Sequence, residues 1–507
     1  MTKPYYITTP LYYVNAKPHI GHAYTQILCD TFARFHRLNG EPVFLLTGTD
    51  EHGTKIDKAA KDAGKEPKQF VDEIVPEFKK LWETLGIGYD HFIRTTDAEH
   101  KIFVQNTLQA LERKGDIYLS KYKGWYCTPC ESFWTALQLK EGKCPDCSRV
   151  VTELEEENYF FKLSQYQGWL VDYIEKNPDW IQPDYRRNEV LGFLKLGALE
   201  DLCITRPKNR LAWGIPYPGS DQHVVYVWFD ALINYIAIGS YAKVEKEFGS
   251  VWPADVHVIG KDILRQHAIY WPVMLKAMGQ ELPKKILAHG WWTVGGDKMS
   301  KSKGNALDPQ EMIQKYTVDG FRYYLLKEVT LGQDGTYSEA LMTERYNTDL
   351  ANDLGNLVSR SIAMLEKYFG SEIPAVTDRS KLQLWVLTRL TNVEDRMKFY
   401  DPRNALAEIW DLIKIANQYI DEKKPWVLAK EKKEDELKIV LFNLMQTIRS
   451  CAILLQPFLP TTSKKILHYF GIGKEVLLKE AGNWSSLKPG TKIQKCEILF
   501  PKFDVKR

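Results

Sequence analysis

Short apolar runs and helical repeats alternate along the first part of the chain. Residues 5–9 are rich in aromatic and β-branched side chains, which is typical of a strand. The apolar residues that follow recur at helical spacing up to Gly40. A second apolar run, 42–47, precedes a polar turn and another helical stretch. Strand, turn and helix in this order predict the βα units of a doubly wound parallel sheet, in which ligands bind at the carboxyl ends of the strands.

The alternation of strands and helices is interrupted at about Gly115, where the composition changes, and it resumes after His223. Residues 224–228 are interpreted as a strand, 229–235 as the start of a helix, and 255–260 as a further strand. From about Thr343 no strands are predicted, and apolar residues recur at helical spacing instead. We therefore predict an α/β fold, with a doubly wound (Rossmann-like) parallel sheet split by an insertion, followed by an all-α bundle. The further helices of the bundle are expected near 382–399, 405–421 and 435–454.

Composition narrows the class of protein without naming a partner. A chain of 507 residues with 44% hydrophobic and 26% charged residues is long enough for about three soluble domains. The net charge of +3 requires any RNA-binding surface to be a local patch. The long apolar run 224–242 contains Asp230 and Asn234, which favours a buried strand and helix over a membrane span. Because no leader is recognised, we expect a cytoplasmic protein with no membrane partner.

Four of the eight cysteines are clustered. Cys127 and Cys130 form one C-x-x-C pair, and Cys144 and Cys147 form a second one after a loop of 13 residues. In a cytosolic protein this arrangement favours one tetrahedral zinc ion over disulfides, although a pair of redox motifs is the alternative. Four cysteine ligands leave no open position for a substrate, so the zinc is expected to be structural.

The turn after the first strand carries His19, Gly21 and His22 at the start of the predicted helix. A helix N-terminus has unpaired N–H groups and a partial positive charge, which together favour phosphate. Two imidazoles there suit a nucleoside triphosphate, while two ordinary helix-start histidines are the alternative. Asp50 in the next turn, and Asp262 after the strand 255–260, either cap a helix or contact a ligand at the same edge of the sheet.

A lysine-rich loop, 295–304, contains Lys298 and Lys301 within the sequence Lys-Met-Ser-Lys-Ser. By itself such a loop is most simply a solvated surface segment. Together with His-x-Gly-His near the start of the chain, however, it resembles the pair of signatures of class I aminoacyl-tRNA synthetases. Over nearly its whole length the chain resembles the bacterial methionyl-tRNA synthetase family.

The resemblance implies a methionine–tRNA ligase. Such an enzyme activates L-methionine with ATP to methionyl-adenylate and pyrophosphate, then transfers methionine to the 3′-terminal adenosine of initiator and elongator tRNA(Met). His19, His22, Lys298 and Lys301 are the implied catalytic residues, acting with Mg²⁺ on the phosphates. Together with these four, Gly21, Gly260 and Asp262 are the implied ATP-binding residues.

The resemblance also implies a methionine pocket and an anticodon site. An unbranched thioether packs well against aromatic rings, which agrees with an aromatic pocket. In the helical region, an aromatic residue among lysines suits stacking on unpaired bases, although a tryptophan that covers a helix end is the alternative. The implied CAU anticodon residues are Asn356, Arg360 and Trp426. The implied methionine-binding residues are Leu11, Tyr13, Asp50, Trp228, Leu232, Tyr235, His267 and Trp271.

Six regions follow from these expectations. Many relatives continue into a further RNA-binding dimerisation domain, and this sequence ends before one. We therefore expect a monomer, or a catalytic chain served by a separate tRNA-binding subunit. The insertion is expected to help seat the tRNA acceptor end. The regions are 1–114, the first half of the nucleotide-binding catalytic domain; 115–223, the connective insertion with the zinc knuckle; 224–290, the second half of the catalytic domain; 291–342, the lysine-loop and stem-contact region; 343–475, the helical anticodon-binding domain; and 476–507, an extended C-terminal tail.

Three alternatives remain open at this point. The first is a class I synthetase for another amino acid. An enzyme for a branched-chain amino acid usually carries an editing domain, for which the insertion leaves little room. A cysteine enzyme usually binds its substrate through a catalytic zinc, which four cysteine ligands would not allow. A small nucleotidylyltransferase would need neither the insertion nor the bundle. A non-catalytic RNA-binding paralogue would not need His19, His22, Lys298 and Lys301.

Overall fold

The computed structural model describes residues 2–128, 132–134, 136–145, 147–294, 297–298, 307–376, 381–473 and 476–503. The chain forms two compact units, which are considered separately below. The first comprises residues 1–29, 42–83 and 89–291, and the second comprises 30–41, 84–88 and 292–507.

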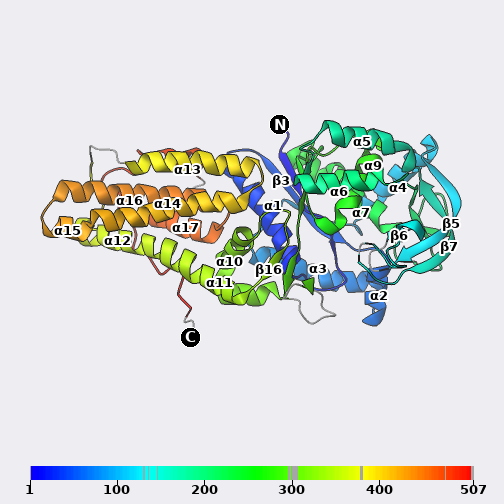
Figure 1. Cartoon of the computed structure of the whole chain (residues 1–507), viewed down its shortest axis with the longest axis horizontal. Coiled ribbons are helices and arrows are strands. Elements are labelled where there is room, and N and C mark those ends of the chain that lie inside the picture. Colours follow the sequence, from blue (N-terminus) through cyan, green and yellow to red (C-terminus); the bar gives the residue numbers. More distant parts are fainter. Residues whose placement is uncertain are drawn as a thin grey trace. The chain divides into compact units, whose positions relative to one another are not determined.

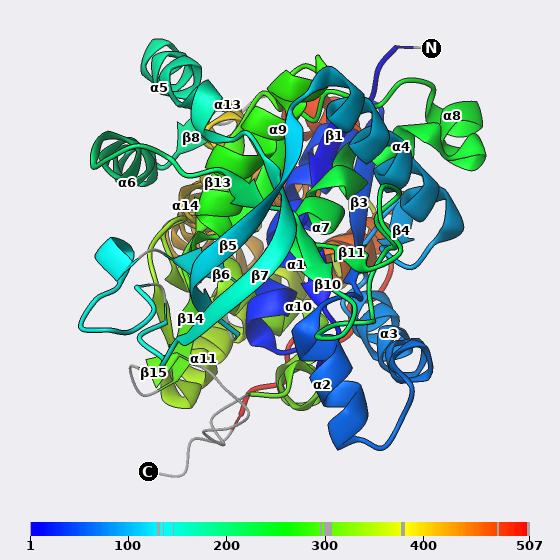
Figure 2. The ribbon, with the colours of Figure 1, turned by 90° about the vertical axis from the view of Figure 1, so that its right-hand side faces the viewer.

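A seven-stranded sheet lies at the centre of the first unit (Figure 2). Its order is β2-β3-β1-β12-β13-β8, β4 also pairs with β3, and every pairing is parallel. The predicted doubly wound parallel sheet is therefore confirmed. The strands are β1 (Tyr5–Thr8), β2 (Tyr12–Tyr13), β3 (Val43–Asp50), β4 (His91–Arg94), β8 (Ile181–Gln182), β12 (Val256–Gly260) and β13 (Ile286–His289).

Helices follow these strands because the apolar residues between them recur at helical spacing. The first helix, α1 (Ile20–Leu38), begins one residue after His19, as predicted. The other helices before the insertion are α2 (Thr54–Asp62), α3 (Pro67–Thr84) and α4 (Ala98–Lys114). Those that follow the insertion are α7 (Val227–Ala237), α8 (Ala242–Phe248) and α9 (Trp271–Met278).

The insertion contains a separate antiparallel sheet of order β6-β5-β7-β9. Its long paired strands, β5 and β7, lie toward the viewer in Figure 2. Its short strand β8 lies at the edge of the main sheet, where it pairs with β13. The elements of the insertion are β5 (Ile117–Cys127), β6 (Ser132–Trp134), β7 (Thr152–Phe161), α5 (Gln167–Lys176), α6 (Asp184–Lys195), β9 (Leu202–Cys203), β10 (Thr205–Pro207) and β11 (His223–Val225).

The predicted strand 224–228 is wrong in its length and its place. The strand β11 ends at Val225 and pairs antiparallel with β10 outside the main sheet, and α7 already begins at Val227. A short apolar run cannot be distinguished from a buried helix by its periodicity alone. Every residue of α7 is buried, so this helix shows no polar face. The predicted strand 42–47 is correct but too short, because β3 continues to Asp50.

Helices dominate the second unit, as predicted, and Figure 1 shows α13, α14 and α16 side by side. A small sheet of order β15-β14-β16 precedes them. Residues 491–494 of the predicted tail hydrogen-bond to residues 371–373 and Tyr469. The strands are β14 (Trp292–Val294), β15 (Asp297–Lys298) and β16 (Gly335–Tyr337). The helices are α10 (Pro309–Glu328), α11 (Glu339–Arg345), α12 (Asn356–Phe369), α13 (Lys381–Lys398), α14 (Pro402–Lys423), α15 (Pro425–Lys430), α16 (Glu434–Leu455) and α17 (Pro460–Tyr469).

One helix of the bundle, α16, is long and apolar enough to cross a membrane. Its apolar window is 89% buried inside the protein, however, which is the usual situation of a central helix in a bundle. The apolar run around α7, considered above as a membrane span, is likewise a buried helix.

Candidate active site

His19 and His22 lie together at the N-terminus of α1. Their rings stack with centroids 3.8 Å apart, and the His19 backbone N–H donates to His22 Nδ1 over 3.2 Å. Both side chains are partly exposed. The arrangement therefore presents two imidazoles at the positive end of a helix, which favours binding of an anion.

Gly21 is required by the position of the His19 ring. The Gly21 N–H donates to His19 Nδ1 over 3.1 Å, and a Cβ atom added to Gly21 would lie 2.9 Å from His19 Cε1. Real Cβ atoms essentially never approach a neighbour so closely. The glycine thus allows the imidazole to lie against the first turn of the helix.

The other predicted nucleotide residues follow β12. Gly260 ends this strand, and Asp262 is exposed in the turn Lys261–Ile263. Asp262 Oδ1 accepts a hydrogen bond of 3.1 Å from Trp291 Nε1, and Lys261 Nζ lies 4.2 Å from the centre of the Trp291 ring. Gly260 and Asp262 are therefore neighbours at the carboxyl end of a central strand, where ribose-binding acids lie in doubly wound folds.

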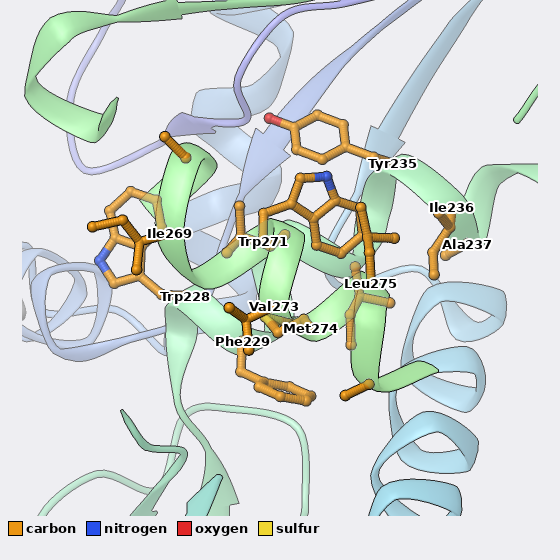
Figure 3. Packing of buried hydrophobic residues seen from close by; sticks show 14 of the residues in the cluster. Trp228, Phe229, Tyr235, Ile236, Ala237, Ile269, Trp271, Val273, Met274 and Leu275 are labelled. Atoms are coloured by element: carbon orange, nitrogen blue, oxygen red, sulfur yellow. The ribbon is translucent and has the colours of Figure 1, made fainter. Parts of the chain in front are cut away.

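The aromatic members of the predicted methionine pocket belong to one hydrophobic cluster. It buries Trp228, Leu232, Tyr235 and Trp271, with Leu11 and Tyr13 packed against it. In Figure 3 the Tyr235 ring lies beside the Trp271 indole, while the Trp228 indole points to the opposite side. Tyr13 meets Trp228 edge to face, with centroids 6.4 Å apart.

Two polar groups in this cluster bond to each other. The His267 side chain lies within 2.9 Å of the Ile263 carbonyl through Nδ1, so Nδ1 carries the proton and Nε2 accepts from the Tyr235 hydroxyl over 2.8 Å. Burial lowers the pKa of His267 to about 4 and raises the pKa of Tyr235 far above its ordinary value. Both side chains are therefore neutral near pH 7, as an apolar pocket for a thioether requires.

His257, which the sequence interpretation missed, supports the aromatic wall that Tyr235 and Trp271 form. Its Nε2 accepts from Trp271 Nε1 over 3.1 Å, its Nδ1 lies 2.7 Å from Thr8 Oγ1, and its ring lies 4.3 Å from that of Tyr235. Burial lowers the pKa of His257 well below its ordinary value, which keeps Nε2 free of a proton and able to accept.

Asp50 ends β3 and is 2% exposed. The parallel register of β2 and β3 places Tyr13 opposite Asp50, so the structure brings these two predicted methionine residues together. Gly53 occupies the N-cap of α2, and Gly260 that of the turn Lys261–Ile263, which contains Asp262. The helix-cap alternatives for the two acids are therefore wrong.

A buried acid that the sequence did not reveal lies on α7. Asp230 contacts His52 Nδ1 at 2.7 Å and His100 Nε2 at 2.6 Å, and all three side chains are buried. Although burial alone would raise it, the pKa of Asp230 is lowered because both histidines stabilise the carboxylate. The residues are 48 to 178 positions apart, so no sequence spacing links them.

Three of the four knuckle cysteines come together. The sulfur atoms of Cys127, Cys144 and Cys147 all lie within 4.8 Å of one another, and Cys127 Sγ is 3.5 Å from Cys147 Sγ. Cys130 lies outside the described residues. Three convergent thiols are a donor set suited to a soft divalent ion such as zinc.

The lysine loop lies mostly outside the described residues. Lys301 is among the residues not described, and only the backbone position of Lys298, in β15 of the second unit, is given. Their predicted contacts with phosphate therefore stay predictions.

The predicted anticodon residues all belong to the second unit. Asn356 is exposed at the start of α12, Arg360 Nη2 lies 3.4 Å from Asp421 Oδ1, and Trp426 is 44% exposed in α15. Exposure of a large aromatic side chain there agrees with a role in binding rather than in the core.

Comparison with known proteins identifies the relatives of the chain. A family model described as "tRNA synthetases class I (M)" matches residues 5–153 and 148–362, and one described as "Anticodon binding domain of methionyl tRNA ligase" matches residues 374–506. The methionine–tRNA ligase of Caldanaerobacter subterraneus is 50% identical, covering 100% of this chain and 80% of the relative. That of Thermotoga maritima is 45% identical, covering 99% and 81%.

Solved structures agree over the full length. The Mycobacterium tuberculosis methionyl-tRNA synthetase in complex with methionyl-adenylate has a TM-score of 0.92 at 39% identity, covering 99% of this chain and 100% of that one. The free state of the same synthetase has a TM-score of 0.86 at 36% identity, covering 99% of each chain.

Proposed function

This chain belongs to the methionine–tRNA ligases, which are class I aminoacyl-tRNA synthetases, and from that premise we propose which residues carry out each step. The enzyme activates methionine with ATP to methionyl-adenylate and then transfers the methionyl group to tRNA. The alternatives of another amino acid, a nucleotidylyltransferase and a non-catalytic paralogue are thereby excluded.

We propose that the first step is an in-line displacement at the α-phosphorus of ATP. An oxygen of the methionine carboxylate forms the new P–O bond, and the bond to pyrophosphate breaks. No protein nucleophile is required, so catalysis consists of positioning and charge stabilisation. His19 and His22 donate hydrogen bonds to the phosphates, Lys298 and Lys301 neutralise the departing pyrophosphate, and Gly260 and Asp262 hold the ribose. Bound with ATP, Mg²⁺ supplies further charge neutralisation.

The methionine pocket follows from the same geometry. The Asp50 carboxylate is proposed to hold the ammonium group, and the aromatic wall receives the side chain. Leu11, Tyr13 and Trp228 are proposed to contact one side of methionine, and Leu232, Tyr235, His267 and Trp271 the other. Support comes from the burial of this wall and from the mutual hydrogen bond that satisfies the Tyr235 hydroxyl and His267 Nε2.

The second step requires the tRNA to be held at both ends. We propose that Asn356, Arg360 and Trp426 bind the CAU anticodon by hydrogen bonds and stacking, supported by the exposure of Trp426. Cys127, Cys130, Cys144 and Cys147 would hold one structural zinc ion, which crosslinks the loops of the insertion. Cysteines that converge on a metal site, rather than pairing in disulfides, also support a cytoplasmic location.

The stacked pair His19–His22 at the start of α1, in the same unit as the aromatic wall, carries the proposal most directly. The test is pyrophosphate exchange into ATP, measured with each of the twenty amino acids. Exchange with methionine alone is expected. Exchange with a different amino acid would contradict the assignment of the pocket, beginning with Tyr235 and His267.

A further inference from the structure

A tryptophan of the insertion contacts the segment that follows Asp50. Trp213 lies in the loop between β10 and β11, more than 150 residues after the end of β3. We propose that Trp213 is a positioning residue for methionine: it holds the backbone of residues 51–53 and thereby orients the Asp50 carboxylate. The inference rests on the proposed contact of Asp50 with the methionine ammonium group.

Three contacts join Trp213 to this segment. Trp213 Nε1–H donates to the Glu51 carbonyl over 2.5 Å, and the Gly53 N–H donates to the Trp213 carbonyl over 3.4 Å. The His52 ring lies 5.3 Å from the Trp213 ring. Side chain and backbone of one residue therefore contact three successive residues of the segment.

The segment has no regular structure of its own to fix its backbone. Residues 51–53 lie between the end of β3 and the start of α2, and Gly53 has a φ of 99°, which only glycine adopts without strain. Buried backbone groups in such a turn need partners from elsewhere. The indole N–H of Trp213 is such a partner for the Glu51 carbonyl.

The side chains of the same segment are fixed by other elements. The Glu51 carboxylate accepts from Arg94 Nε at 2.6 Å and from Arg94 Nη2 at 2.9 Å, and Thr49 and Thr96 each donate to it over 2.6 Å. His52 is held by Asp230. These contacts fix the side chains of Glu51 and His52, and the Glu51 N–H donates to Thr95 Oγ1 over 3.0 Å. The Glu51 carbonyl is restrained by Trp213.

Loss of the indole N–H would therefore act next to Asp50. A buried carbonyl without its donor is unfavourable, so the peptide would turn to find a new partner. The Asp50 carboxylate would move with it, and a small displacement weakens a charge-assisted contact strongly. ATP does not contact this segment in the proposed arrangement, so the effect should be confined to methionine.

The experiment replaces Trp213 by phenylalanine, which retains the ring and removes the N–H. Trp180→Phe is the matched control, because Trp180 Nε1–H also donates to a backbone carbonyl, that of Pro283, at 2.8 Å in the same unit. Methionine-dependent pyrophosphate exchange gives KM for methionine, KM for ATP and kcat, and thermal unfolding reports stability. Trp213→Phe should raise KM for methionine roughly tenfold, leaving KM for ATP and kcat within about twofold. The control should leave all three constants unchanged even where it lowers Tm.

A pair of inhibitors isolates the ammonium group. Methioninol carries the amino group, and 4-(methylthio)butan-1-ol lacks it. Trp213→Phe should weaken inhibition by methioninol and leave inhibition by the desamino alcohol unchanged. Equal weakening of both, an unchanged KM for methionine, or an equal rise in both KM values would overturn the proposal.

The role of Asp50 is tested independently. If Asp50→Asn leaves KM for methionine unchanged, the proposed function of Asp50 fails, whatever the result for Trp213. If Asp50→Asn raises it, Trp213→Phe should add no further increase in the double variant, because the two residues act on one contact. Additive increases would show that Trp213 acts without Asp50 and would overturn the inference.

Discussion

The two ends of the candidate active site are built differently. At the nucleotide end, His19 and His22 are partly exposed, and the hydrogen bonds described above join them to each other and to Gly21. The His22 ring also lies against Tyr12 and Phe78. At the methionine end, Tyr235, His267 and Trp271 are at most 2% exposed. Hydrogen bonds join Tyr235 to His267 across 32 positions and Trp271 to His257 across 14. The phosphate site is thus a local motif on a surface, whereas the methionine pocket is part of the main hydrophobic core.

Because of this difference, substitutions at the two ends should affect catalysis and stability differently. A side chain on the surface can be removed without opening a cavity, so its loss should appear in catalysis alone. A side chain in the core contributes to both, because the same packing holds the pocket and the fold. The following variants test that separation.

Trp271→Ala should have the largest effect. The indole is fully buried against Tyr235 and bonds to His257, so its removal should lower the free energy of unfolding by about 3–5 kcal/mol. Denaturant unfolding monitored by circular dichroism measures this loss. A loss below about 1 kcal/mol would contradict the view that the pocket is part of the core.

His22→Ala should show the opposite behaviour. Removal of a phosphate donor should reduce kcat for methionine-dependent exchange by roughly 10²–10³-fold. Because the side chain is partly exposed, Tm should hardly change. The exposed His468 on α17 supplies the control, and His468→Ala should alter neither quantity. A fall in kcat of less than about fivefold would remove His22 from the catalytic residues.

Gly21→Ala sharpens the contrast further. The new Cβ would displace the His19 imidazole, so kcat should fall about tenfold. Alanine has the higher helix propensity, by about 1 kcal/mol, so stability should be unchanged or slightly increased. A variant that is both stable and fully active would show that the position of the His19 ring is unimportant for the reaction.

A pH dependence of stability should mark the methionine end. The pKa of His267 is about 4 in the folded protein, against an ordinary value of 6.5, so the unfolded chain binds the proton first as pH falls. The stability due to neutral His267 is complete above about pH 6.5 and is lost progressively down to about pH 4. Between pH 7 and 5.5 this loss amounts to about 1 kcal/mol. His267→Gln should remove this loss of about 1 kcal/mol from the change in the free energy of unfolding between pH 7 and 5.5. An unchanged pH dependence of the free energy of unfolding would contradict the assignment.

The sequence predicted the local parts of this molecule well. The motif at His19, Gly21 and His22 needs only one strand end and one helix start, both of which follow from residue patterns. The parallel sheet and the helical bundle were predicted for the same reason. The division into six regions stays a prediction, because the two compact units follow different boundaries.

The long-range parts could not be predicted from patterns. The strand at 224–228 was misjudged because α7 is buried on every side and has no helical polar face. The contacts of Asp230 with His52 and His100, and of Trp213 with Glu51, join residues 130 to 178 positions apart. The π-helix Tyr346–Gly355 leaves no mark on the apolar spacing that predicts a helix after Thr343.

The position of β1 has a consequence for the synthesis of the chain itself. This strand pairs with β3 on one side and with β12 on the other, and its Thr8 bonds to His257, 249 residues further along. At about 5–20 residues per second, a ribosome needs roughly 12–50 s to make the stretch between them. Throughout that time the nascent chain exposes an open strand edge, which is a template for wrong pairing. Until β12 is synthesised, β1 therefore lacks its partner on that side, and a product terminated before β12 keeps the open edge.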